Sequence, residues 1–180
     1  TMGSLANYAN STNPTSAAGS NTAALVTGLG GQAACNATAG AATDFIFWSY
    51  QNPAGGLAQT PRKLIINGVW LSAINMGAAV ATTPTTLAWS LAFGHTAVSL
   101  ATTEAATTKA PRRIPLGAQS VPVGAAVGAM YVPEIIAQTF SSPVVVMPGE
   151  FVALVGKIIV GTATASQSVW VVSGVDHYFV

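Results

Sequence analysis

The sequence contains few charged residues. Lysine, arginine, aspartate and glutamate make up 6 % of its 180 residues, against roughly 25 % in an ordinary soluble domain. The formal net charge at pH 7 is +1, which gives no general attraction to nucleic acid or to an acidic membrane surface. We therefore expect neither nucleic acid nor membrane among the partners of this chain.

Cysteine and long apolar runs are also scarce. The single cysteine, Cys35, excludes an internal disulfide framework and a cysteine-based metal site, and we interpret it as a small apolar residue. Hydrophobic residues make up 51 % of the chain, but much of this is alanine, and no run reaches the ~18 consecutive apolar residues of a membrane span. The composition therefore does not predict a transmembrane helix.

Groups that could perform acid–base or metal chemistry are few and scattered. The chain has five acidic residues and two histidines, whereas hydrolytic or metal catalysis requires several such groups to converge. Asp176 and His177 are neighbours in a β-rich run, so their side chains should point to opposite faces and cannot hold one metal together. Glu150 follows turn residues and is expected to be solvated or bonded to backbone N–H groups. We predict no enzymatic activity, cofactor or metal.

Residues 1–40 differ in composition from the rest of the chain. They contain alanine, glycine, serine, threonine and asparagine, with Tyr8 as the only aromatic residue, and the first charged residue is Asp44. Such a segment cannot bury enough apolar surface to fold alone. We interpret it as an extended N-terminal arm that lies on a neighbouring subunit, with Tyr8 as a candidate contact. A flexible linker from a longer precursor is the alternative.

Residues 41–180 are predicted to form one all-β domain. Large apolar residues alternate with small ones over residues 87–93, which indicates a strand with one large-residue face. Residues 62–74 and 151–160 are apolar on both faces, as expected where each side is covered, and residues 168–180 form a further β-rich run. Short strands, Gly/Pro/Thr turns and weak helix signals predict an antiparallel β-sandwich or jelly roll.

The segment Met147-Pro148-Gly149-Glu150 separates two of these apolar runs. Proline followed by glycine suits the two central positions of a type II turn. We therefore predict a β-hairpin whose strands are residues 144–146 and 151–155.

Half of the six cationic residues lie in one short stretch: Lys109, Arg112 and Arg113. Pro111 and Pro115 restrict the backbone there, so the arginines are held on a stiff, extended segment. They could keep an edge loop soluble and unpaired, or bind fixed acceptors on a neighbouring subunit through planar guanidinium groups. Nucleic-acid binding is disfavoured because so few cations are available. Two further cationic residues, Arg62 and Lys63, are also candidate subunit contacts.

Three stretches of the sequence resemble a known family. They are "GAAVATTPTTLAWSLAFGHTAVSLATTEAATT" (77–108), "KAPRRIPLGAQSVPVGAAVGAM" (109–130) and "VVVMPGEFVALVGKIIVGTATASQ" (144–167). They are similar to small proteins encoded with the head and structural genes of tailed bacteriophages. The resemblance covers roughly residues 40–180, and its most specific parts are the KAPRR-P-LG and PGEF elements.

This resemblance implies a jelly-roll virion protein without enzymatic activity, and it carries over no catalytic residue. It implies a homotrimeric cement or decoration protein on the capsid exterior, whose partners are the major capsid protein and other copies of itself. A receptor- or glycan-binding protein of the tail or head fibre is the alternative. That function requires exposed aromatic residues, for which Trp70 and Tyr131 are the candidates, although the strand setting of Trp70 favours a core position.

Overall fold

The computed structural model describes residues 34–38, 45–52, 54, 60–76, 84–95, 112–126, 130–131, 135–160 and 168–180. All regular elements in these ranges are β-strands, and every strand pair is antiparallel. The predicted all-β class is therefore confirmed for the described part of the chain. Tyr8, Lys109 and most of the predicted N-terminal arm lie outside the described residues.

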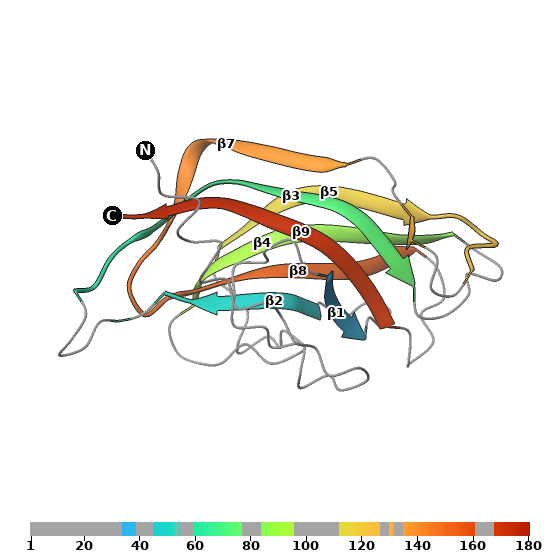
Figure 1. The fold of residues 1–180 in the computed structure, drawn as a ribbon, viewed down its shortest axis with the longest axis horizontal. Helices are drawn as coiled ribbons and strands as arrows, with labels where there is room; N and C mark the ends of the chain where they lie inside the picture. Colours follow the sequence, from blue (N-terminus) through green and yellow to red (C-terminus); the bar gives the residue numbers. More distant parts are fainter. Residues whose placement is uncertain are drawn as a thin grey trace.

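The strands form two sheets (Figure 1). The first has the order β1-β9-β3-β6, with β7 also paired to β3, and its strands are β1 (Ala34–Thr38), β9 (Ser168–Phe179), β3 (Leu64–Met76), β6 (Met130–Tyr131) and β7 (Ile136–Val146). The second has the order β2-β8-β4-β5, and its strands are β2 (Phe45–Gln51), β8 (Phe151–Val160), β4 (Thr85–His95) and β5 (Arg112–Val121).

The strand pairs are nested along the sequence. The innermost pair is β4 with β5, followed outward by β3 with β7, β2 with β8, and β1 with β9. Each member of a pair belongs to the same sheet as its partner, while successive pairs alternate between the two sheets. The chain therefore runs back alongside itself as a folded double ribbon, and its first and last described strands are neighbours.

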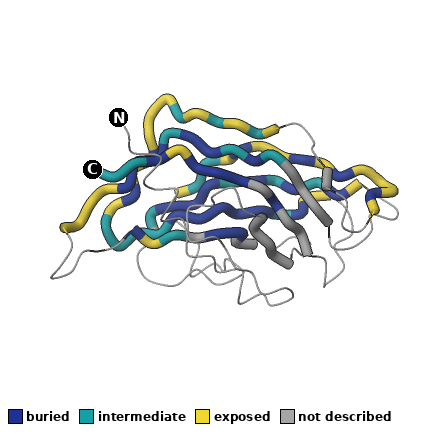
Figure 2. The backbone as a smooth tube through the Cα atoms, in the orientation of Figure 1, coloured by how far each residue is buried: buried dark blue, intermediate teal, exposed yellow. Residues whose placement is uncertain are grey.

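The predicted strands agree closely with the observed ones. The run 151–160 coincides with β8, while 62–74, 87–93 and 168–180 overlap β3, β4 and β9. The predicted large-residue face of β4 is buried, because Leu87, Trp89 and Leu91 are at most 2 % exposed. These residues belong to one apolar cluster that contains side chains from both sheets. Figure 2 shows that the central strands are buried while β7 is largely exposed.

A β-bulge in β2 places two large aromatic residues in this cluster. The register with β8 shifts between Ile46 and Trp48. Because of this bulge, the consecutive residues Phe47 and Trp48 are both fully buried. The Phe47 ring meets the Trp89 ring edge-on, with the ring centroids 4.8 Å apart. A Cβ on Gly156 would come within 2.6 Å of both rings. Glycine at position 156 therefore makes room for this aromatic pair.

The hairpin predicted around residues 147–150 is wrong, although the turn itself is present. Gly149 has φ of 86°, and the Glu150 N–H donates to the Met147 carbonyl at 3.0 Å. The strands on its two sides join different sheets, because β7 pairs with β3 while β8 pairs with β2 and β4. The turn residues determine the local bend, whereas burial of the apolar faces on opposite sides of one core determines the strand partners.

Part of the segment predicted as an arm belongs to the first sheet. Residues 34–38 form β1, which pairs with β9 from Ala34 opposite Val172 to Thr38 opposite Ser168. This strand ends the sheet on the side away from β7. The part of the chain before residue 34 therefore leads into the first sheet at that edge.

Candidate subunit-contact surfaces

Asn52 connects three segments at one end of the two sheets. It is 1 % exposed, and its amide group donates to the carbonyls of Arg62, at 2.7 Å, and Val146, at 3.0 Å. Its backbone N–H donates to the Glu150 carbonyl at 2.9 Å, and its own carbonyl accepts from Gly149. Asn52 thereby holds the end of β2, the start of β3 and the turn between β7 and β8 together.

Arg112 binds to its own chain at this same end. Its guanidinium carbon lies 4.9 Å from the centre of the Phe93 ring, and its Nη2 lies 3.5 Å from Oε1 of Glu150. The other carboxylate oxygen of Glu150 accepts from the Met147 N–H at 2.9 Å, as expected for a carboxylate beside a turn. The Arg112 side chain is 54 % exposed, so this ion pair contributes only about 0–1 kcal/mol.

Arg113 lies on the other face of β5. Its register partner is Ala92, which belongs to a small buried cluster with Ala153 and Val155, separate from the main core. The residue is half-buried, and its Nε and Nη2 atoms are buried. Because neighbouring strand residues point to opposite faces, Arg112 and Arg113 do not present their guanidinium groups side by side.

Arg62 and Lys63 are exposed and precede β3. The guanidinium carbon of Arg62 lies 5.6 Å from the centre of the Phe179 ring, which also meets the Tyr50 ring edge-on at 6.5 Å. Burial raises the pKa of Tyr50, and the positive charge of Arg62 acts in the opposite direction. The Lys63 backbone exchanges two hydrogen bonds with Val180, at 2.8 and 3.0 Å.

The structure thus connects two of the predicted contact groups. Arg62 is joined through its carbonyl to Asn52, and Asn52 is bonded to Glu150, the partner of Arg112. Lys109 and Tyr8 lie outside the described residues. The sequence analysis did not select Asn52, although the Asn-Pro dipeptide at 52–53 is a turn signal. Its bonds to residues far along the chain had no sequence signature.

His177 is buried in the last strand. It is 4 % exposed, whereas its neighbour Asp176 is exposed, which confirms that the two side chains point to opposite faces. Its Nδ1 lies 3.1 Å from the Val175 carbonyl, and its Nε2 is buried without a hydrogen-bond partner among the described residues. Burial lowers the pKa of His177, while the Val175 carbonyl and the Asp176 charge act in the opposite direction.

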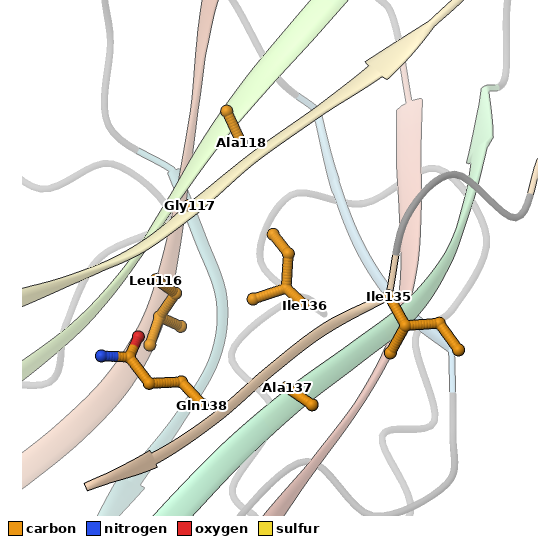
Figure 3. Close-up of a pocket in the computed structure, with 7 residues that line it drawn as sticks. All are labelled: Leu116, Gly117, Ala118, Ile135, Ile136, Ala137 and Gln138. Atoms are coloured by element: carbon orange, nitrogen blue, oxygen red, sulfur yellow. The ribbon is translucent and has the colours of Figure 1, made fainter.

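An open groove lies between β5 and β7 (Figure 3). It has a volume of about 420 Å³. Its lining consists of uncharged residues from β5, from β7 and from the position just before β7: Leu116, Gly117, Ala118, Ile135, Ile136, Ala137 and Gln138. Gly117 has φ of 127°, and a Cβ there would lie 3.3 Å from Cδ1 of Ile136. The side chain of Ile136 therefore packs directly against the backbone of Gly117.

Trp70 is not in the core, in contrast to the sequence-based expectation. It is half-buried, and its indole lies over Gly174 of β9, where a Cβ would come within 2.4 Å of three indole atoms. Gly174 separates Ser173 and Val175, both of which are buried between the sheets. The indole therefore lies on the outer face of the first sheet. Tyr131, the other candidate, forms part of β6.

No known family model and no curated protein matches the sequence. Within the described ranges, no three histidine, cysteine, aspartate or glutamate residues are grouped so that they could hold a metal ion. The described residues also include no helix of the length and apolarity needed to cross a membrane.

Proposed function

We propose that this chain is a structural protein of a bacteriophage virion, a cement or decoration protein on the capsid exterior that stabilises the head through subunit contacts. In this role it has no enzymatic activity and assembles as a homotrimer. The major capsid protein and other copies of the chain are its partners. The sequence resemblance to phage head proteins suggests this role, and the arrangement of the strands supports it.

The nested strand pairing is the observation that carries the proposal. Without the two-residue β6, eight strands remain, in the orders β1-β9-β3-β7 and β2-β8-β4-β5. This is the strand order of a jelly-roll sandwich, in which a double ribbon of antiparallel strands is folded into two sheets. Jelly rolls are the fold of many viral capsid domains and of many lectins. We propose that the fold belongs to this class, with residues 1–40 as an arm whose residues 34–38 form β1.

Exposed apolar residues support an obligate assembly. Ile159 and Val160 at the end of β8 are 52 % and 53 % exposed, and Ile135 before β7 is 58 % exposed. Surfaces that are apolar and poor in charge are typical of obligate interfaces, which resemble a domain core cut in half. We expect light scattering to show a trimer at micromolar concentration. A stable monomer would contradict the assembly part of the proposal.

The attachment experiment uses phage particles that lack this protein. Replacing both Arg112 and Arg113 by alanine should weaken attachment, and circular dichroism of the variant checks that the fold survives the loss of the exposed Arg112–Glu150 pair and of the half-buried Arg113 side chain. Loss of one side of a desolvated charged pair costs roughly 2–5 kcal/mol, against about 0–1 for a screened pair. The double lysine variant should restore attachment only in part, because lysine lacks the planar guanidinium group. Equal occupancy for all three proteins would contradict a contact through these arginines.

Trp70 favours a second candidate, a glycan- or receptor-binding virion protein. Its indole lies on the outer face, beside a row in which Thr139 and Asp176 flank Gly68, and both flanking residues are exposed. An aromatic ring next to hydroxyl and carboxylate groups is suited to stacking and hydrogen bonding with a sugar. A glycan-binding screen with wild type and Trp70→Ala tests this. Binding that is lost in the variant would support the candidate, and an absence of binding by the wild type would reject it.

A further inference from the structure

We propose that the groove between β5 and β7 binds an extended segment of a second copy of this chain, drawn from residues 1–33. This inference rests on the proposed assembly of several copies. It goes beyond that proposal by naming the acceptor groove and the segment that fills it.

Both strands that border the groove are sheet edges. Within the described residues, β5 pairs with β4 alone and β7 with β3 alone, so one side of each strand is available to pair with another segment. Such edges pair with other chains unless charges, prolines or a covering segment prevent it. Pro115 and Pro143 interrupt the two strands, but residues 116–121 and 136–142 contain no charge. The edges at the groove are therefore suited to accept a further strand.

The groove also suits an extended, uncharged chain. Its inner wall contains the buried Leu116, while Ala118 and Ala137 at its rim are exposed and small. Figure 3 shows the side chains of Leu116 and Ile136 in the space between the two strands. In strand addition of this kind, backbone hydrogen bonds supply affinity and the side-chain pockets supply selectivity. Shallow walls without charge select small, neutral side chains.

Residues 1–33 match this description. They contain no charged residue, and they are dominated by alanine, glycine, serine, threonine and asparagine. Leu25, Val26 and Thr27 are consecutive, and two of the three are β-branched, so this run has the strongest strand propensity in the segment. Fully extended, 33 residues span up to roughly 110 Å. This reach is sufficient to bring the segment onto a neighbouring subunit.

The position of β1 indicates that the segment in the groove comes from a second copy and not from the same chain. β1 begins at Ala34 and forms one edge of the first sheet, and β9 and β3 separate that edge from β7. A direct path from β1 to the groove would cross the outer face of this sheet, where Val145, Thr139 and Asp176 are exposed. A neighbouring copy can deliver its segment without covering that face.

The test uses the full-length assembled protein with a photo-reactive residue at the rim, Ala118→p-benzoylphenylalanine. Copies labelled with heavy isotopes are mixed with unlabelled copies before assembly, and cross-linked peptides are identified by mass spectrometry. The expected result is a cross-link from position 118 to residues 1–33 of a differently labelled copy. The same photo-reactive residue at the exposed Ala126, which does not line the groove, is the control and should not give this cross-link.

A second pair of variants tests whether the groove itself is required. The double variant Ala118→Lys/Ala137→Lys places two charges at the rim, where they oppose strand addition. A photo-reactive residue in place of Gln138 in the same protein reports whether the groove is occupied. The cross-link to residues 1–33 should be lost in this variant and retained with Ala126→Lys. Cross-links within one chain, to another segment, or unchanged by the two lysines would overturn the inference. A protein that stays monomeric would instead contradict the proposed assembly.

Discussion

The indole nitrogen of Trp48 donates a hydrogen bond to the hydroxyl oxygen of Ser173 at 3.1 Å, and both residues are fully buried. Trp48 belongs to β2 and Ser173 to β9, so this bond joins the two sheets through the core. It is the kind of bond that satisfies a tryptophan N–H which would otherwise be buried without a partner.

Removing the hydroxyl group at position 173 should therefore destabilise the protein. Ser173→Ala leaves the Trp48 N–H buried and unpaired, at a cost of about 1–3 kcal/mol in the free energy of unfolding. Trp48→Phe removes the N–H group, so Ser173→Ala should have a smaller effect in that background. Urea denaturation of the four proteins gives the coupling energy. Additive effects would show that the bond contributes nothing measurable.

Asn52 should be important for stability because it satisfies two carbonyls with one side chain. Asn52→Ala removes both bonds, and each buried group left without a partner costs roughly 1–3 kcal/mol. Asn52→Asp should be at least as harmful, because a carboxylate would face the carbonyls of Arg62 and Val146 without a donor. Denaturation midpoints measure both effects. An unchanged midpoint for Asn52→Asp would contradict the role that we assign to the amide.

His177 should make stability depend on pH. Its pKa is lowered in the folded protein, mainly by burial, while the unfolded chain takes up a proton near pH 6.5. Below that pH the unfolded state binds more protons than the folded state. The free energy of unfolding therefore decreases as the pH is lowered, by at most about 1.4 kcal/mol per pH unit, until the folded pKa is reached. Above pH 6.5 this effect is absent.

The measurement is the denaturation midpoint between about pH 4.5 and 8.5, a range of about two units below and above the free histidine pKa. His177→Leu should flatten the slope below pH 6.5, whatever its effect on absolute stability. His95→Gln, at the only other histidine, should leave that slope in place. A slope that is unchanged in His177→Leu would show that other groups cause it.

Two glycines that lie beneath aromatic rings should respond differently to alanine. In Gly156→Ala the new methyl group would meet Phe47 and Trp89, which are confined between the sheets, and such overpacking typically costs about 1–3 kcal/mol. In Gly174→Ala it would displace Trp70, which is only half-buried and lies on the outer face instead of between the sheets. We expect a smaller loss of stability and a larger change in tryptophan fluorescence for Gly174→Ala. Equal losses would contradict an outer position for Trp70.

The strands were predictable because their signals are local. The alternation over residues 87–93 and the largely apolar run 151–160 depend on neighbouring residues only, and both strands were found where expected. Strand partners were not predictable in this way. The turn at 147–150 was recognised from Pro148 and Gly149, yet the flanking strands belong to different sheets, because pairing depends on residues far along the chain.

The sequence also did not show which face of a strand that is apolar on both sides would lie in the core. Trp70 was assigned to the core because its strand is apolar, but the space that accepts its indole is created by Gly174, more than 100 residues away. Arg112 shows the same limit. Its position on a stiff segment was expected, but its partner Glu150 had no visible relationship to it in the sequence.

The nested pairing also has a consequence for how the protein folds during synthesis. The central strand of the first sheet, β3, is flanked by β9, and Leu64 is paired with Phe179. A ribosome that has produced the first half of the chain has therefore released β3 without either of its neighbours, because β6, β7 and β9 all lie in the second half. The first sheet cannot be completed until residues 168–179 have been made, and contacts between such distant segments form slowly. The apolar faces of β3 must remain exposed during that interval, so a nascent chain of this protein is a natural client for a chaperone.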